Sequence, residues 1–184
     1  QELSEGEILQ LGNIGKEDFS EEAYFDVIRK KTAALFKASS QSGAVSVGAV
    51  QEEVMKAGLL GEMIGIAFQI KDDIFDYFES PELGKPTGND MLEGKLTLPA
   101  LYVLNQTGDD SLKQAALRIR SLEASKEEIA NFVETVKEKG GIEYATRMMY
   151  EFRDKALALV PASADSSLKE ALTAYIDYVI ERNK

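Results

Sequence analysis

The stretch QEEVMKAGLLGEMIGIAFQIKDDIFDYF, at residues 51–78, sets how this chain folds. Its apolar side chains recur at steps of three or four residues, which is the period of an α-helix. They are Leu59, Met63, Ile66, Ile70, Ile74 and Phe78. Gly61 and Gly65 lie in the same stretch, where a glycine lets a neighbouring helix or a ligand approach closely. The pattern predicts one long helix that packs against others.

The rest of the chain also favours helix, and the predicted fold class is all-α. Only four of the 184 residues are Pro, and Ala, Leu, Glu and Lys dominate long stretches. The length suits a single helical domain covering residues 1–184. Besides the long helix, we expect helices near residues 4–11, 20–39, 97–105, 110–122, 126–139, 141–158 and 165–182, with breaks at 39–48 and 79–96.

Several of these helices carry capping signals at their starts. Ser20 suits an N-cap because two acids follow it in the first turn. Ser125 with Glu128 matches a capping box. The pair Asp109-Asp110 has no third acid nearby and reads as a helix-start turn.

The composition excludes several classes of function. The chain has no Cys and no His, which removes thiol nucleophiles, His general bases and the usual zinc sites. Its net charge of −11 argues against a surface for nucleic acid or anionic membrane. No apolar stretch reaches the roughly 18 residues that a membrane span needs. A cytoplasmic protein is the default expectation.

One face of the long helix carries a group of acids. Gln69, Asp72, Asp73 and Asp76 stand at i, i+3, i+4 and i+7, so their side chains project from one side. The plain alternative is a solvated acidic face, but the neighbouring residues are strongly apolar, and partly buried carboxylates need a counter-charge. Magnesium suits such a site, because it combines carboxylates with waters and substrate phosphate oxygens.

Two lysines in the following segment point to the same ligand. Lys85 follows Gly84 and Lys95 follows Gly94, so each amine lies beside flexible backbone that can fold over an anion. A lysine of this kind, taken alone, is most often simply solvated. The two become informative only next to the aspartates.

The order of these motifs resembles a known family. FQIKDDIFDY at residues 68–77, then GKPTGND at 84–90 and EGKLTLP at 93–99, closely resembles the second aspartate-rich region of the trans-isoprenyl diphosphate synthases. Lys31-Thr32 resembles that family's Lys-Thr pair, and residues 3–7 resemble the helix before it. The resemblance covers residues 1 to about 105 and implies an antiparallel helical bundle of the isoprenoid synthase fold.

The resemblance implies a metal and diphosphate site. Asp72 and Asp73, supported by Asp76, would ligate Mg²⁺ bound to an allylic prenyl diphosphate. Lys31 and Lys85 would neutralise the diphosphate as it leaves. The chemistry needs no nucleophilic side chain, because metal ions and amines stabilise the departing oxygens.

It also implies roles for neighbouring residues. Thr32 and Gln69 would line the developing allylic cation and the path of the proton lost afterwards. Phe68 would pack beside isopentenyl diphosphate, and Lys95 would lie at the edge of the site. The activity implied is prenyl-chain elongation, of the long-chain polyprenyl (octaprenyl) type, by an enzyme that is a homodimer when full-length. Arg182 and Lys184 resemble the family's basic C-terminal tail.

The sequence departs from the family in one respect. It contains neither the first aspartate-rich motif nor the Arg pair that follows it. We therefore expect a fragment that corresponds to the C-terminal part of a synthase, with the N-terminal helices missing and no transferase activity on its own. Two other readings stay open: a class I terpene cyclase, and a non-catalytic helical partner subunit of a heteromeric synthase. Lys31-Thr32 and the motif at 94–99 speak against the first, and the retained aspartates speak against the second.

Overall fold

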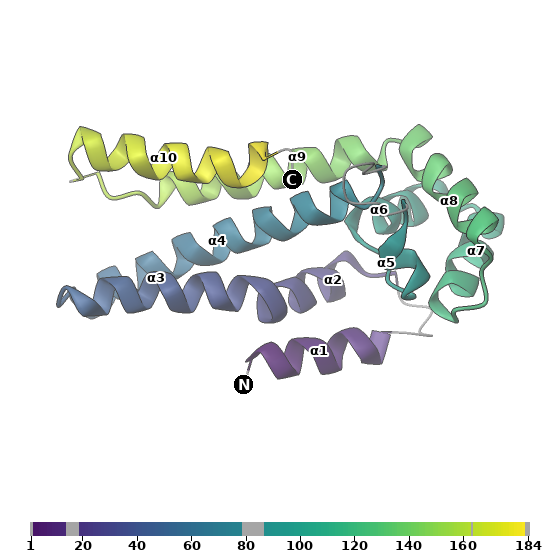
Figure 1. The fold of residues 1–184 in the computed structure, drawn as a ribbon, viewed down its shortest axis with the longest axis horizontal. Helices are drawn as coiled ribbons and strands as arrows, with labels where there is room; N and C mark the ends of the chain where they lie inside the picture. Colours follow the sequence, from purple (N-terminus) through teal and green to yellow (C-terminus); the bar gives the residue numbers. More distant parts are fainter. Residues whose placement is uncertain (1, 14–18, 79–86, 163, 183–184) are drawn as a thin grey trace. The chain divides into compact units, whose positions relative to one another are not determined.

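The computed structural model describes residues 2–13, 19–78, 87–162 and 164–182. Every regular element in those ranges is a helix (Figure 1). The elements are α1 (Glu2–Asn13), α2 (Glu21–Ile28), the π-helix η1 (Arg29–Ala33), α3 (Ala34–Ser46), α4 (Gln51–Phe75), α5 (Asn89–Leu92), α6 (Leu98–Thr107), α7 (Asp110–Arg120), α8 (Lys126–Glu138), α9 (Gly141–Ala158) and α10 (Ser166–Glu181). The predicted all-α fold is confirmed. Within the described ranges, none of these helices combines the length and apolarity needed to cross a membrane.

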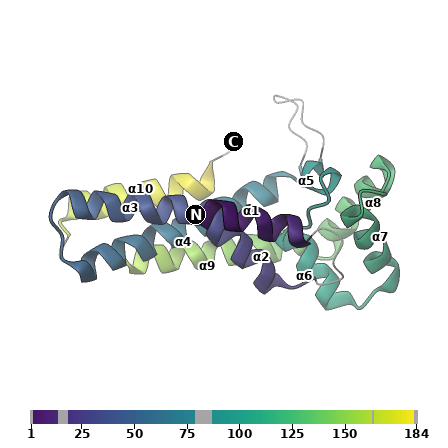
Figure 2. The same cartoon turned by 90° about the horizontal axis from the view of Figure 1, so that it is seen from below.

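The chain divides into two compact units, and helix α4 contributes to both. Unit 1 consists of Gln1–Gly6, Ile28–Lys71 and Arg147–Lys184. In unit 1, α3 and α4 form an antiparallel pair, as do α9 and α10 (Figures 1 and 2). Its core contains the almost fully buried side chains of Ile66, Ile70, Ile176 and Ile180. The repeating apolar steps on α4 therefore mark this core, as expected from helical periodicity.

Unit 2 consists of Glu7–Val27 and Asp72–Thr146. It holds α1 from Glu7 onward, most of α2, the end of α4, helices α5 to α8 and the start of α9. The core of unit 2 is built mainly from α6, α7 and α8 and includes Leu98, Leu101, Leu104, Ile119, Val133 and Val136. The single domain expected from the chain length stays a prediction.

The predicted caps lie where the sequence puts them. The backbone N–H of Ala23 donates to Ser20 Oγ at 3.2 Å. Asp109 accepts hydrogen bonds from the first turn of α7, which confirms the helix-start reading of that acidic pair. Ser125 and Glu128 form the complete capping box of α8. These signals are local, so tertiary contacts do not alter them.

Glu128 gives a test of this local chemistry by pH. Its bond to Arg118, together with its bonds to Ser125, lowers the pKa of Glu128 from 4.5 to about 2. An acid whose pKa is lowered by folding stabilises the fold above its unfolded pKa, and the stabilisation is lost as pH falls through its folded pKa. We expect Glu128→Gln to lower the melting temperature at pH 7, and the difference from the unaltered chain to shrink below about pH 4.5. Thermal melts at pH 7 and pH 3 measure it, with the exposed neighbour Glu127→Gln as the control. A difference of equal size at both pH values would contradict the assignment.

The structure corrects the predicted break at residues 39–48, because α3 continues to Ser46. One of the small residues there, Ser40, belongs to a close helix–helix contact. A Cβ atom built on Gly61 of α4 would lie 2.5 Å from both Phe36 O and Ser40 Oγ of α3. Helices that pack this closely need small side chains at the contact, and such packing stabilises a helix beyond its intrinsic propensity.

Two further predictions about the long helix need correction. The helix ends at Phe75, whereas the sequence pattern extends to Phe78. Leu59 and Phe78, assigned to the apolar stripe, are 44% and 46% exposed. Phe78 lies beyond the helix end, where Lys137 Nζ lies 5.2 Å from its ring centroid. The stripe is therefore buried only in its middle part.

Candidate functional site

Lys31 and Thr32 lie in an unusual turn of unit 1. The helix predicted over 20–39 contains the π-helical segment η1 at Arg29–Ala33, which holds both residues. Single π-helical turns inside α-helices occur frequently at functional sites. The turn is closely packed on two sides: a Cβ on Gly6 of α1 would lie 2.8 Å from Lys31 N, and a Cβ on Gly65 of α4 would lie 2.6 Å from Ala33 Cα.

The structure brings two of the predicted site residues of unit 1 together. Thr32 Oγ1 donates a hydrogen bond to Gln69 Oε1 over 2.7 Å. Because its carbonyl oxygen accepts this bond, the Gln69 amide is oriented, and its NH₂ group points away from Thr32. The two residues are separated by 37 positions in the chain, so the bond depends on the packing of η1 against α4.

Phe68, also in unit 1, has an aromatic neighbour and a cationic one. Its ring centroid lies 5.3 Å from that of Phe36 on α3. The guanidinium carbon of Arg182 lies 3.7 Å from the Phe68 centroid, and Arg182 Nη2 donates to Phe68 O at 3.3 Å. This is a close cation–π contact. The contact links the C-terminal end of α10 to α4.

In unit 2, Asp73 is buried and has a partner that the sequence reasoning missed. Asp73 is 3% exposed. Tyr24 on α2 is buried as well, and its hydroxyl donates to Asp73 Oδ2 at 2.5 Å. Burial first, and then the charge of Asp73, raise the pKa of Tyr24 well above its ordinary value, so Tyr24 stays a donor. In the sequence, Tyr24 reads only as an apolar position on a helix.

Asp76 binds a short segment inside the predicted break at 79–96. Its two carboxylate oxygens accept hydrogen bonds from the backbone N–H groups of Asn89, at 3.0 Å, and Asp90, at 3.1 Å. Burial, followed by the charge of Asp90, raises the pKa of Asp76 to about 6. The negative charge of the Asp76 carboxylate is therefore poorly compensated, although the two backbone N–H groups favour its ionised form.

Lys95 lies among acids in the same unit. Its amine bonds to Glu93 and lies 3.9 Å from Asp90 Oδ1. Burial acts to lower the pKa of Lys95, but the Glu93 bond and the charges of Asp90, Glu93 and Asp73 raise it overall. Lys95 thus stays cationic beside the aspartates. We refer to Asp72, Asp73, Asp76, Asp90, Glu93 and Lys95 together as the acidic site.

The donor atoms of the acidic site suit a hard cation. They are carboxylate oxygens, which Mg²⁺ and Ca²⁺ prefer, and the raised pKa of Asp76 marks negative charge that a cation would stabilise. Across the described residues, no group of three carboxylates is already gathered for a metal ion. Asp73 and Asp76 are held by different partners, Tyr24 and the segment at 89–90. Mg²⁺ needs only one or two carboxylates when waters and phosphate complete its shell, so the acidic site fits that ion.

Lys85 lies outside the described residues, so the structure gives no position for it.

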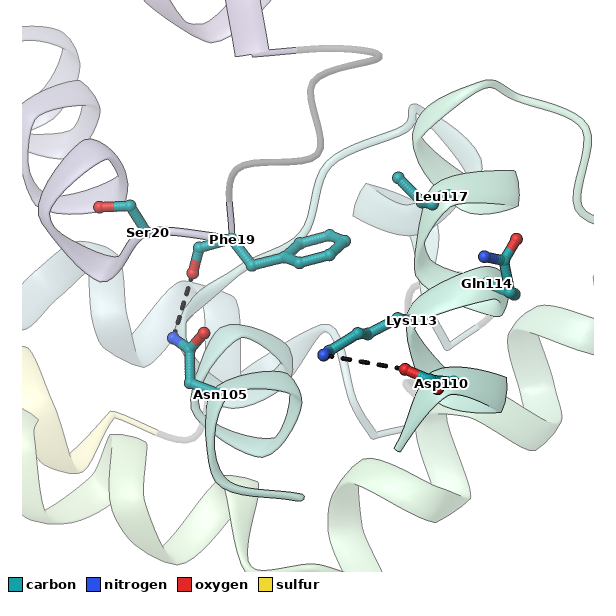
Figure 3. Close-up of a pocket in the computed structure, with 7 residues that line it drawn as sticks. All are labelled: Phe19, Ser20, Asn105, Asp110, Lys113, Gln114 and Leu117. Carbon is teal, nitrogen blue, oxygen red and sulfur yellow. Dashed lines mark hydrogen bonds and ion pairs between the residues drawn. The ribbon is translucent and has the colours of Figure 1, made fainter. Parts of the chain in front are cut away.

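A separate hollow of about 510 Å³ lies on unit 2 (Figure 3). It is lined by Phe19, Ser20, Asn105, Asp110, Lys113, Gln114 and Leu117. Asn105 Nδ2 donates to Phe19 O at 3.1 Å, and Lys113 Nζ lies 4.0 Å from Asp110 Oδ1. None of the residues predicted to bind metal or substrate lines this hollow. It is distinct from the acidic site.

Comparison with known proteins places the chain in a family. The model of the polyprenyl synthetase family matches residues 1–136. The chain belongs to the polyprenyl synthetase family, so the resemblance seen in the aspartate-rich segment is confirmed. The remaining residues are matched in the individual relatives, which align with nearly the whole chain.

Three relatives describe the range of the similarity. Octaprenyl diphosphate synthase of Escherichia coli (strain K12) is 32% identical over 183 residues, which are 99% of this chain and 56% of that protein. The crystal structure of geranylgeranyl pyrophosphate synthase from Bacteroides thetaiotaomicron superposes with a TM-score of 0.94 at 56% identity, covering 99% of this chain and 60% of that one. The polyprenyl synthase from Caulobacter crescentus CB15, complexed with calcium and isoprenyl diphosphate, gives a TM-score of 0.86 at 31% identity, over 100% of this chain and 56% of that one. The chain therefore spans somewhat more than half the length of these relatives.

Proposed function

We propose that this chain carries the second metal and diphosphate site of a prenyltransferase that condenses an allylic prenyl diphosphate with isopentenyl diphosphate. The observation that carries the proposal is the acidic site, where Asp73 is almost fully buried and the pKa of Asp76 is raised to about 6. Buried carboxylates of this kind call for a cation. A relative that is 31% identical was solved with calcium and isoprenyl diphosphate, which supports a divalent cation and a diphosphate as the ligands.

The residues of the acidic site would have different tasks. Asp72, which is half-buried, and Asp73 would hold Mg²⁺, and Asp76 would support them by fixing the segment at 89–90. Lys95 would attract the diphosphate from the edge of the acidic site, because its amine stays charged. When bound, the metal would stabilise negative charge on the departing diphosphate oxygens.

The residues of unit 1 would serve the organic part of the substrate. Thr32 and Gln69 form a bonded pair whose carbonyl and hydroxyl oxygens can face a developing cation without reacting with it. Phe68 offers an aromatic face beside isopentenyl diphosphate, and Lys31 offers a positive charge for the leaving group. Lys85 has the same role as Lys31 in this proposal.

The wider protein would be an octaprenyl-type synthase that works as a homodimer. The relatives are named for octaprenyl and geranylgeranyl products, and chromatography of the prenyl products of the whole enzyme would measure the chain length. The chain taken alone is expected to be inactive, since it has neither the first aspartate-rich motif nor the Arg pair. Membership of the polyprenyl synthetase family disfavours the terpene cyclase reading.

Calorimetric titration of inorganic diphosphate in the presence of MgCl₂ tests the metal site. We expect the unaltered chain to bind magnesium diphosphate, and Asp73→Asn to weaken binding at least about 10-fold, because it removes a metal-binding charge while its amide oxygen can still accept from Tyr24. The control is Asp110→Asn, a change to an exposed aspartate at the start of α7. Equal heats of binding from Asp73→Asn and the unaltered chain would show that Asp73 does not bind the metal.

A further inference from the structure

The hydrogen bond between Tyr24 and Asp73 has features that set it apart from ordinary core bonds. Both side chains are buried, at 8% and 3% exposure, and the O–O distance is 2.5 Å. It joins α2 to the end of α4 across 49 positions in the chain. A hydroxyl bonded to a carboxylate at this distance is a strong, charge-assisted interaction.

Such a bond constrains the carboxylate in two ways. Tyr24 donates to Oδ2, so the rotation of the Asp73 side chain is constrained. The bond also favours the ionised carboxylate, which burial alone would disfavour. Partners of this kind orient metal-binding side chains, and their loss typically costs 10- to 100-fold in metal affinity.

We infer that Tyr24 is a positioning residue, which holds the Asp73 carboxylate in the orientation needed to bind magnesium diphosphate. The inference rests on the proposed function, because it assigns Tyr24 a role through Asp73. Tyr24 does not itself contact the ligand. Its part is to keep a buried acid in one orientation before the ligand arrives, so that no binding energy is used to reorder it.

The chain contains a matched control for this bond. Tyr144 on α9 donates to Glu21 Oε2 at 2.6 Å, also within unit 2 and also between a tyrosine and a carboxylate. Neither residue belongs to the acidic site. Replacing either tyrosine by Phe removes one hydroxyl and leaves the ring.

The experiment compares Tyr24→Phe and Tyr144→Phe by calorimetry with inorganic diphosphate at fixed MgCl₂. We expect the Kd to rise about 10-fold for Tyr24→Phe and to stay unchanged for Tyr144→Phe. Thermal melts without metal, run on Tyr24→Phe, Asp73→Ala and the double variant, measure the bond itself, because alanine, unlike asparagine, leaves Tyr24 no side-chain acceptor at position 73. We expect non-additive shifts in melting temperature, because the two residues share one bond.

The outcomes separate the inference from the proposed function. An unchanged Kd in folded Tyr24→Phe, alongside binding by the unaltered chain, would overturn the role of Tyr24 and leave the metal site standing. An equal rise in Tyr144→Phe would overturn it too, since the effect would then be general. No binding by the unaltered chain would overturn the proposed function, and the inference with it. Additive shifts in melting temperature would show that Tyr24 and Asp73 do not interact, and the inference would then be wrong.

Discussion

Replacing Gly65 by Ala is expected to destabilise the fold by about 2–3 kcal/mol, the upper part of the range for overpacking a closely packed interior. A Cβ on Gly65 would lie 2.6 Å from the Cα of Ala33, so the clash is with backbone and cannot be relieved by a side-chain rotation. Ala33 is fully buried in η1, next to Thr32. The substitution therefore pushes α4 away from the turn that carries the predicted substrate-binding residues.

Gly43→Ala provides the control, and its expected effect on the free energy of unfolding has the opposite sign. Gly43 is also a helical glycine, on α3, but nothing lies within 4 Å of the Cβ that it would gain. Alanine there should stabilise the helix by about 0.5–1 kcal/mol, through its higher helix propensity. Urea unfolding followed by circular dichroism measures both variants. A neutral or stabilising Gly65→Ala would show that the packing of α4 on η1 is looser than described.

The second large effect concerns catalysis. With an allylic diphosphate, isopentenyl diphosphate and MgCl₂, we expect the chain alone to form product at least about 1,000-fold more slowly than the full-length Escherichia coli octaprenyl diphosphate synthase. The reason is electrostatic: ionising an allylic diphosphate requires several positive charges around the leaving group, and the sequence contains only one aspartate-rich motif proposed to bind metal ions.

Product formation from radiolabelled isopentenyl diphosphate measures this directly. We expect the same preparation to bind magnesium diphosphate, which would show that the chain is folded and that the proposed metal site is formed. Turnover near that of the full-length relative would contradict the expectation. It would mean that the acidic site suffices for ionisation.

Local features of the fold could be predicted from the sequence, and features made by long-range contacts could not. The caps at Ser20, Asp109 and Ser125 are correct because each depends on neighbours within one turn. The break expected at 39–48 is wrong because α3 continues to Ser46, and Ser40 in this segment packs against Gly61 on another helix. A single sequence does not distinguish a small residue in a turn from one in a close contact.

In the candidate site, too, local features could be predicted from the sequence and long-range contacts could not. Periodicity placed Asp73 on a mostly buried helix, and the structure confirms that burial. Tyr24 was missed because it lies 49 positions away and has the spacing of an ordinary core residue. The π-helical turn was missed as well, since the segment RKKTA at 29–33 carries no signal that separates it from regular helix. The metal and substrate roles stay predictions until they are measured.

The π-helical turn has a consequence for how this chain tolerates changes in length. Such a turn accommodates one residue more than the regular helical repeat, so everything after it is rotated by about 100° relative to an uninterrupted helix. Deleting one residue between Arg29 and Ala33 would therefore remove the extra residue, so that the turn closes as regular α-helix while α3 keeps the same face toward α4. An inserted or deleted residue would be harmless in many loops, but here it would disrupt the alignment of Thr32 with Gln69.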